Sequence, residues 1–368
     1  MRSALLSALL LSTLARAADP EPSPLHFTAS LDDGLKVESN DGNYGVQLGA
    51  LMWGRFDAAV AGAVVKDQFL VPLMRPALRA HFVRPWINVF AQAELAGTPT
   101  LLDLELDVHP IPEIGLKLGQ LVTPFSRAYL TPIPKLQFGG FTVANDVFRM
   151  NRDTGVLAYG TALNNRLEYF AGVFNGNGID VATNDNPQLM YAGRLAGTLF
   201  GTAPNPKAHV RYDETAALTG AAPATLMVGI DGYVDRLSTT GQADQLKRAA
   251  SVDAAFLYRR LFVQAEGYLQ GVELVGSPTQ TRFGADAQVG FFVWPSTLEL
   301  AGRFSWVRLD ASDASAWLVQ GEGQLGWYVA GNHLKAIARY VLTDTGSAQR
   351  GYAAGITHGV FVQLQAWL

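Results

Sequence analysis

Three carboxylates at alternate positions are the first residues in this sequence that could do chemistry. Asp103, Glu105 and Asp107 are spaced two apart in the segment LLDLELDVH. Two carboxylates held close together can serve as the acid and the base of a glycoside hydrolase. A spacing of two also places all three on one face of a β-strand, with apolar residues on the other face. We favour the second role, in which the acids belong to a water-facing wall.

No motif in the sequence indicates a catalytic centre. The six histidines are dispersed without an HExxH zinc motif, and neither a GxSxG nucleophile elbow nor a P-loop occurs. The chain has no cysteine, which excludes thiol enzymes, zinc fingers and disulfide scaffolds. We therefore predict that the protein is not an enzyme and needs no cofactor or metal. A hydrolase that uses dispersed loop acids and histidines is a minor alternative.

A second group of interest is cationic. Between residues 124 and 152 the chain carries four basic residues and one acid, a charge of +3 within a chain of net charge −4. Guanidinium and ammonium groups bind carboxylates and phosphates through charge-assisted hydrogen bonds. The four basic residues are Arg127, Lys135, Arg149 and Arg152. They have the chemistry of a site for small anions, provided that the fold places them beside a solute.

Composition narrows the class of protein that must position these groups. The chain has 368 residues, of which 49% are hydrophobic and only 16% are charged. This is too apolar for a disordered protein, and the net charge offers no basic patch for nucleic acid. Globular domains usually contain about 25% charged residues. The low charged fraction therefore indicates that part of the outer surface faces something other than water.

The first seventeen residues have the features of an export signal. Arg2 precedes the apolar stretch 4–14, and Ala15-Arg16-Ala17 supplies the small residues of a cleavage site. A membrane anchor is the alternative, but the stretch is shorter than the roughly 20 residues that a spanning helix needs. We predict a signal peptide over 1–17 and a chain exported to an oxidising compartment.

The rest of the chain alternates apolar and polar residues over short segments that end at turn residues, which is typical of β-strands. We expect an N-terminal periplasmic segment over 18–43 and sixteen strands within 44–368. The strands are predicted at 44–57, 71–83, 86–96, 101–109, 113–123, 154–163, 166–175, 189–200, 225–235, 249–259, 261–272, 281–293, 296–308, 317–329, 333–343 and 351–368.

The connections between these strands differ in length in a regular way. Tight turns follow most even-numbered strands, whereas most connections after odd-numbered strands are longer, and the longest covers 124–152. Short turns at one end and long loops at the other are typical of outer-membrane β-barrels. The 201–224 connection is an exception, because it is long yet lies on the short-turn side. It indicates either an extra small element or an error of register.

Aromatic residues support a membrane barrel, because Trp and Tyr prefer the two interfaces of a bilayer. One group lies beside the short turns and the C-terminus, and a second group lies nearer the long loops. The first group is Trp86, Tyr258, Phe262, Trp294, Trp327, Tyr328 and Trp367, and the second is Trp306, Trp317, Tyr340 and Tyr352. A secreted sandwich or jelly roll would explain the export signal and the strands, but not two aromatic girdles.

Several stretches resemble those of one family. They are DGLKVESNDGNYGVQLGALMWGRFD, GLKLGQLVTPFSRAYL, RDTGVLAYGTALNNRLEYFAGVFNGNG and YAGRLAGTLF. These stretches resemble sequences of the phosphate-selective porins O and P, and the resemblance runs from about Gly34 to Phe200. It implies an all-β fold, a sixteen-stranded antiparallel transmembrane β-barrel that is usually trimeric. It also implies that the third outer loop, here 124–152, folds inward and narrows the channel.

The predicted inner wall departs from that family, whose phosphate selectivity rests on an arginine-rich path. Here the inward positions carry both signs of charge. The cations are Arg55, Arg75, Arg79, Lys117, Arg194, Arg282, Arg303, Lys335 and Arg339, and the acids are Glu94, Asp103, Glu105, Asp107, Asp231, Asp253, Glu266, Asp286, Glu299 and Glu322. Several cations come from neighbouring strands at the predicted closure, whereas three acids share one strand. We expect a field across the lumen.

The sequence therefore predicts a porin in the outer membrane of a Gram-negative bacterium, through which small hydrophilic solutes diffuse with a modest preference for anions. The cations of 124–152 are expected at the constriction, where charge acts most strongly on a passing ion. Their alternative roles are to bind lipopolysaccharide or neighbouring subunits, or to pair with wall acids such as Asp103. The expected partners are outer-membrane lipid and lipopolysaccharide, small anionic or polar solutes, and further copies of the chain in a homotrimer. A non-conducting structural barrel is the alternative for the whole protein.

Overall fold

The structure is a computed structural model. It describes residues 25–61, 64–181, 183–184, 186–203, 212–237, 244–348, 350, 352 and 354–368. The predicted signal peptide, 1–17, lies outside the described residues. No helix among the described residues is long and apolar enough to cross a membrane.

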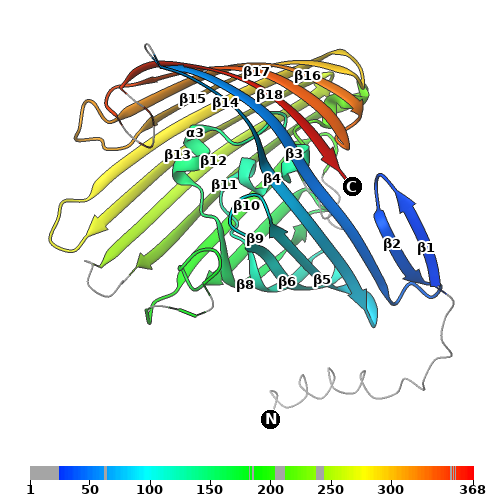
Figure 1. The fold of residues 1–368 in the computed structure, drawn as a ribbon. Helices are drawn as coiled ribbons and strands as arrows, with labels where there is room; N and C mark the ends of the chain where they lie inside the picture. Colours follow the sequence, from blue (N-terminus) through cyan, green and yellow to red (C-terminus); the bar gives the residue numbers. More distant parts are fainter. Residues whose placement is uncertain are drawn as a thin grey trace.

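Sixteen antiparallel strands form a closed barrel, as the sequence predicts (Figure 1). Each strand pairs with its neighbours in the chain, and the last strand pairs with β3 to close the sheet. The strands are β3 (Gly45–Ala61), β4 (Val64–Phe82), β5 (Arg84–Glu94), β6 (Thr100–Ile111), β7 (Ile114–Val122), β8 (Arg152–Ala162), β9 (Leu167–Phe174), β10 (Met190–Phe200), β11 (Ala222–Leu237), β12 (Gln245–Arg259), β13 (Leu261–Leu274), β14 (Gln280–Trp294), β15 (Leu298–Arg308), β16 (Trp317–Ala330), β17 (Leu334–Thr345) and β18 (Gly355–Trp367).

Two parts of the chain differ from the prediction. The expected loop between 57 and 71 is strand, because β3 and β4 stay paired as far as Ala61 and Val64. Continuing the ladder satisfies backbone groups that a loop would leave to other partners. The second difference is a hairpin formed by β1 (Leu25–Ser30) and β2 (Gly34–Ser39), which extends beside the barrel where β2 pairs with β3 (Figure 1).

The strands separate apolar side chains from polar ones by parity. In β6 the Leu104 side chain is 50% exposed on the outer face, whereas its neighbour Asp103 is 3% exposed on the inner face. The same alternation places buried Glu266 and exposed Leu269 of β13 on opposite faces. An apolar outside and a polar inside are what a barrel needs in lipid, since lipid offers no partner for a polar group.

The long segment, residues 123–151, contains two short α-helices and one 3₁₀ helix: α2 (Arg127–Leu130), η1 (Ile133–Lys135) and α3 (Val143–Phe148). Ser126 Oγ accepts a hydrogen bond from the backbone N–H of Tyr129 at the start of α2, and Thr142 Oγ1 caps α3 in the same way. The helix α3 packs against β13, β14 and β15.

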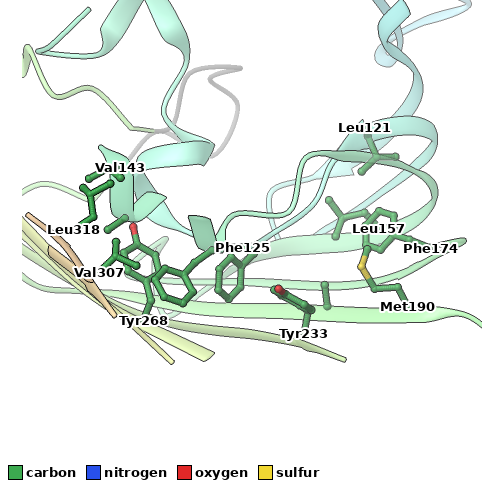
Figure 2. Close-up of a cluster of buried hydrophobic side chains, with 13 residues drawn as sticks. Leu121, Phe125, Val143, Leu157, Phe174, Met190, Tyr233, Tyr268, Val307 and Leu318 are labelled. Carbon is green, nitrogen blue, oxygen red and sulfur yellow. The ribbon is translucent and has the colours of Figure 1, made fainter. Parts of the chain in front are cut away.

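An apolar cluster joins the long segment to the inner wall (Figure 2). Phe125 and Phe148 have no exposed surface, and the Phe148 ring stacks on Tyr268 of β13 with 5.1 Å between ring centres. The Phe125 ring lies 4.9 Å from that of Tyr233 of β11. These contacts bury the aromatic face of the segment and place the core inside the barrel instead of between two sheets.

The exceptional connection on the short-turn side, 201–221, holds the 3₁₀ helix η2 (Ala216–Thr219). It begins beside the turn between β8 and β9, where Arg166 Nη2 donates to the carbonyl of Gly201. It then reaches the turn between β14 and β15, where the Ser296 N–H donates to the carbonyl of Leu218 at 2.7 Å. The strands that it joins, β10 and β11, pair directly with each other, with a register shift between Thr198 and Phe200.

The two faces of β6 give a test of the membrane assignment. Leu104→Arg puts a charge on the lipid-facing side near mid-strand and should lower the free energy of unfolding by about 2–4 kcal/mol. Glu105→Gln, on the inner face beside Lys117, should cost less than about 1 kcal/mol. Urea titration of the protein folded into lipid vesicles measures both, and equal losses would contradict the assignment of the faces.

Candidate functional site

The long segment is held by the acids of the opposite inner wall. The Thr142 hydroxyl donates to Asp286 Oδ2 at 2.8 Å, and Gln137 Nε2 donates to Glu299 Oε1 at 2.7 Å. The backbone N–H of Arg127 donates to Glu266 Oε1 at 3.0 Å. These three acids are predicted lumen residues, and the structure buries them beneath the segment. A solute in the lumen would therefore not contact them.

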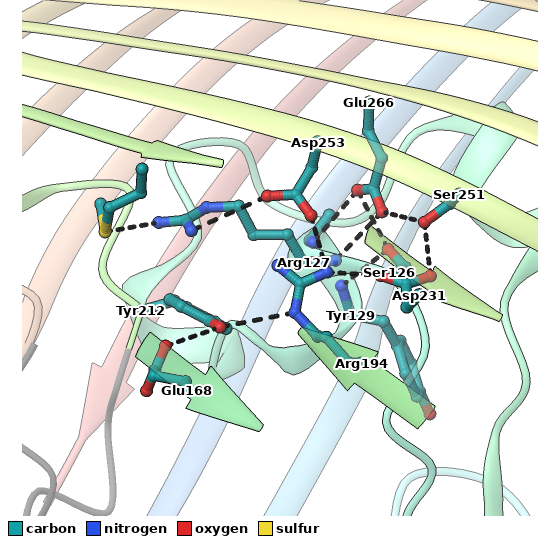
Figure 3. Close-up of polar contacts among 12 residues, drawn as sticks. Ser126, Arg127, Tyr129, Glu168, Arg194, Tyr212, Asp231, Ser251, Asp253 and Glu266 are labelled. Carbon is teal, nitrogen blue, oxygen red and sulfur yellow. Dashed lines mark hydrogen bonds and ion pairs between the residues drawn. The ribbon is translucent and has the colours of Figure 1, made fainter. Parts of the chain in front are cut away.

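A buried charge cluster lies at the start of the same segment (Figure 3). The guanidinium of Arg194 in β10 contacts Asp231 of β11 and Asp253 of β12, and both groups in each pair are fully buried. The Ser251 hydroxyl joins Asp231 to Glu266. Because isolated charges are costly in a buried site, each of these groups depends on its partners.

The spacing of three carboxylates in this cluster raises the question of a metal ion. Oxygens of Asp231, Asp253 and Glu266 lie within 4.8 Å of one another. The Arg194 guanidinium already pairs with both aspartates, and the backbone N–H of Ala128 donates to Glu266 at 3.3 Å. The donors present are thus those of an ion-pair cluster.

The GxGxxG pattern at 321–326 does not form a nucleotide site. It lies within strand β16, whereas a dinucleotide binds at a turn between a strand and a helix.

Arg127 was expected at the constriction, but its side chain is only 2% exposed. Its Nε donates to Gln264 Oε1 at 3.2 Å, and its guanidinium lies 4.2 Å from the centre of the Tyr212 ring. Nη1 is 3.9 Å from Asp253 Oδ1. Arg127 therefore joins the buried cluster and offers almost no surface to a solute, so we leave it out of the candidate site.

The other three cations of the segment each have an acidic partner. Arg152 makes two hydrogen bonds to Asp103, at 3.0 and 3.1 Å, which is the pairing alternative considered from the sequence. Lys135 Nζ lies 3.2 Å from Asp213 Oδ2. Arg149 pairs with Asp146 at 2.9 Å, and its guanidinium also lies over the Tyr129 and Phe141 rings. Lys135 and Arg149 keep about a quarter of their side-chain surface exposed.

The remaining predicted wall residues lie mainly on the side of the barrel formed by β3–β7 and β17–β18. Most form ion pairs between inward side chains, and Asp107 accepts a hydrogen bond from the Tyr159 hydroxyl instead. The pairs are Arg55–Asp57, Arg75–Glu94, Lys117–Glu105 and Arg339–Glu322. Arg55, Arg75 and Lys117 are between 15% and 24% exposed, so this wall is wetter than the one beneath the segment.

Two residues of the wall behave differently from the rest. Arg79 of β4 is half-buried and makes no ion pair with any described residue; its guanidinium lies 4.5 Å from the centre of the Phe90 ring. Lys335 of β17 was expected on the open wall, but it is only 1% exposed. Its ammonium donates to the carbonyls of Pro134 and Leu136 and to Asn332 Oδ1. Lys335 therefore holds the long segment and is closed to solute.

Sequence reasoning missed the residues of the 201–221 connection that reach the site. Tyr212 donates to Glu168 Oε2 at 3.0 Å and lies against Arg127. Glu214 accepts a hydrogen bond from the backbone N–H of Gln137 at 2.9 Å. Burial raises the pKa of the Glu214 carboxyl and that of the Tyr212 hydroxyl. The unusual length of the connection was the one signal in the sequence.

The buried cluster gives a stability prediction with a matched control. Arg194→Met leaves Asp231 and Asp253 buried without their cation and should cost about 3–5 kcal/mol of unfolding free energy. Arg248→Met removes an arginine of β12 that pairs with Glu273 at the exposed outer face, and it should cost about 1 kcal/mol or less. Unfolding in urea distinguishes the two, and similar losses would show that the cluster does not support the barrel.

Comparison with known proteins identifies the fold. No family model and no curated protein matches the sequence, so membership of the phosphate-selective family stays a prediction. Among solved structures, the anion-selective porin from Comamonas acidovorans superposes with a TM-score of 0.63 at 10% identity, covering 88% of this chain and 100% of that one. The outer membrane channel DcaP of Acinetobacter baumannii gives 0.59 at 13% identity, over 89% and 99% of the two chains. OmpT, an outer membrane protein of Vibrio cholerae in its trimer form, gives 0.57 at 12% identity, over 88% and 99%. The chain has the sixteen-stranded barrel fold found in outer-membrane porins.

Proposed function

We propose that the protein is an outer-membrane porin, a passive channel for small hydrophilic solutes with a modest preference for anions. The observation that carries the proposal is the unequal exposure of the two inner walls. The acids beneath the long segment are Asp231, Asp253, Glu266, Asp286 and Glu299, and none is more than 6% exposed. The wetter cations Arg55, Arg75, Arg79 and Lys117 lie on the opposite side of the barrel.

This difference decides which charges act on a passing ion. A buried acid that is paired with Arg194 or hydrogen-bonded by the segment presents no exposed charge to the lumen. A partly exposed guanidinium keeps donors for a solute, and a narrow passage strengthens its field. The sequence places more acids than cations on the inner wall. Because the long segment covers acids of that wall, the surface that a solute meets has more cations than acids.

The preference should be modest because most exposed cations have a carboxylate partner within ion-pair distance. An anion would compete with Asp57, Glu94 or Glu105 for the same donors. Phosphate therefore falls within the proposed range of small inorganic and organic anions without being singled out. The candidate contact groups are Arg55, Arg75, Arg79, Lys117, Lys135, Arg149, Arg152 and Arg339, with Asp103, Glu105 and Asp107 as their acidic counterparts.

The proposed location is the outer membrane of a Gram-negative bacterium, reached by export through the signal peptide, 1–17. The apolar outer face of the barrel fits this location. Assembly as a homotrimer and contact with lipopolysaccharide belong to the same proposal. A barrel that conducts no ions would instead support the structural role.

Arg79 tests the preference most directly, because it is a wall arginine that makes no ion pair with any described residue and lies over the Phe90 ring. Arg79→Gln should shift the reversal potential, measured in a planar bilayer under a salt gradient, toward cations. Arg248→Gln removes the same charge from the outer face and should leave the reversal potential unchanged. A shift of equal size in both variants, or in neither, would contradict a role for the wall.

The long segment has its own test. Lys135→Gln combined with Arg149→Gln removes its two exposed cations while leaving buried Arg127 in place. If the segment lines the constriction, the reversal potential should move toward cations in the same measurement. Unchanged selectivity, with altered trimer stability or lipopolysaccharide binding, would place these cations outside the path of solutes.

A further inference from the structure

The end of the 201–221 connection forms a second structure inside the barrel, on the short-turn side. We call its residues 212–221 the brace. Ala217 has no exposed surface and packs with Ala255, Phe262, Phe292 and Tyr328 of the wall. Gly220 ends η2 in the left-handed conformation at φ 73°, and a Cβ there would lie 2.9 Å from Pro295, so only glycine fits easily. The brace is thus fixed to the wall along its length.

The brace contacts the tip of the long segment, residues 132–137. The backbone N–H of Glu214 donates to the carbonyl of Lys135 at 3.1 Å, and Glu214 Oε2 accepts the backbone N–H of Gln137 at 2.9 Å. The Lys135–Asp213 ion pair joins the same two stretches at 3.2 Å. The backbone N–H groups of Glu214 and Gln137 thus each find an acceptor across this contact. A tip in any other position would leave both donors without these partners.

A third element completes the junction. Asn332, in the turn between β16 and β17, donates from Nδ2 to Thr215 Oγ1 at 2.6 Å. Asn332 Oδ1 accepts from Lys335 Nζ, which also binds the carbonyls of Pro134 and Leu136. The brace, the tip and the turn therefore form one hydrogen-bonded unit although they come from distant parts of the chain.

The unit crosses the barrel. At one side the tip residue Ile133 packs against Leu51, Trp53 and Leu73 of β3 and β4. At the other side Tyr212 of the brace lies against Arg194 of β10. What remains beside it is the wall of β4–β9, which carries Arg79 and Lys117. The path left for a solute is therefore bounded by the unit on one side and by the exposed cations on the other.

We infer that the brace is a positioning element of the channel, which fixes the tip and so sets the pore size at the short-turn end. This inference rests on the proposed porin function. Glu214 and Lys335 are its positioning residues, since neither has appreciable surface for a solute. A merely structural brace would stabilise the barrel without changing what passes through it.

Single-channel conductance and exclusion of polyethylene glycols of increasing size test the inference. Glu214→Leu and Lys335→Met should raise conductance about twofold and admit larger polymers, because a released tip widens the path. Glu214→Gln keeps an acceptor for Gln137 and should match the wild type. Thr219→Ala, on the exposed side of the brace, is the matched control. Variants that fold, shown by a heat-modifiable band on a gel, yet keep wild-type conductance and polymer cut-off would overturn the inference.

A cross-link gives a second measurement that does not depend on these variants folding. The chain has no cysteine, so Lys135→Cys with Asp213→Cys introduces the only two thiols. A short thiol-reactive cross-linker should join them in the membrane-inserted protein with Glu214 in place. In a Glu214→Leu background that folds, joining should also reverse the rise in conductance. Failure to link would show that the tip does not lie on the brace. A double-cysteine protein that links normally, together with a wild-type protein that conducts no ions, would contradict the porin function while leaving the brace intact.

Discussion

The absence of hydrogen-bonding partners in lipid is the constraint on which this structure depends. A sheet exposed to hydrocarbon must pair every backbone N–H and C=O within itself, and only closure of β18 on β3 removes both edges. Closure fixes parity, so each strand presents one face to lipid and the other to the lumen. The inner face must then hold the polar residues, and much of the architecture consists of finding partners for them.

The inner acids show how those partners are found. Backbone and side-chain donors of the long segment satisfy Glu266, Asp286 and Glu299, and Arg194 pairs with the neighbouring aspartates. The segment is thus bound to the wall by the groups that would otherwise make the lumen acidic. The same contacts therefore have two effects: they position the segment, and they shield negative charge from the solvent.

The sequence predicts the barrel well because its signal is local. Parity within β6 or β13 is visible in ten residues, and the alternation of tight turns with long loops is visible in the spacing of the strands. The sequence did not predict the extension of β3 and β4 or the β1–β2 hairpin, because pairing between strands, not composition, decides both. The sequence likewise did not predict the burial of Arg127 and Lys335. This burial depends on contacts such as Thr142 with Asp286, 144 residues apart, or Lys335 with Pro134, 201 residues apart.

The same distances bear on how the chain reaches its folded state. The tip of the long segment binds Lys335 of β17 and Gln365 of β18, the last two strands to be synthesised. A barrel that closed first would have to admit the segment through its mouth against a finished wall. A barrel that closes around the segment instead forms the strand-to-strand hydrogen bonds and the interior contacts in a single cooperative step. Such long-range pairing costs loop-closure entropy before its contacts stabilise the chain, so the chain should fold slowly.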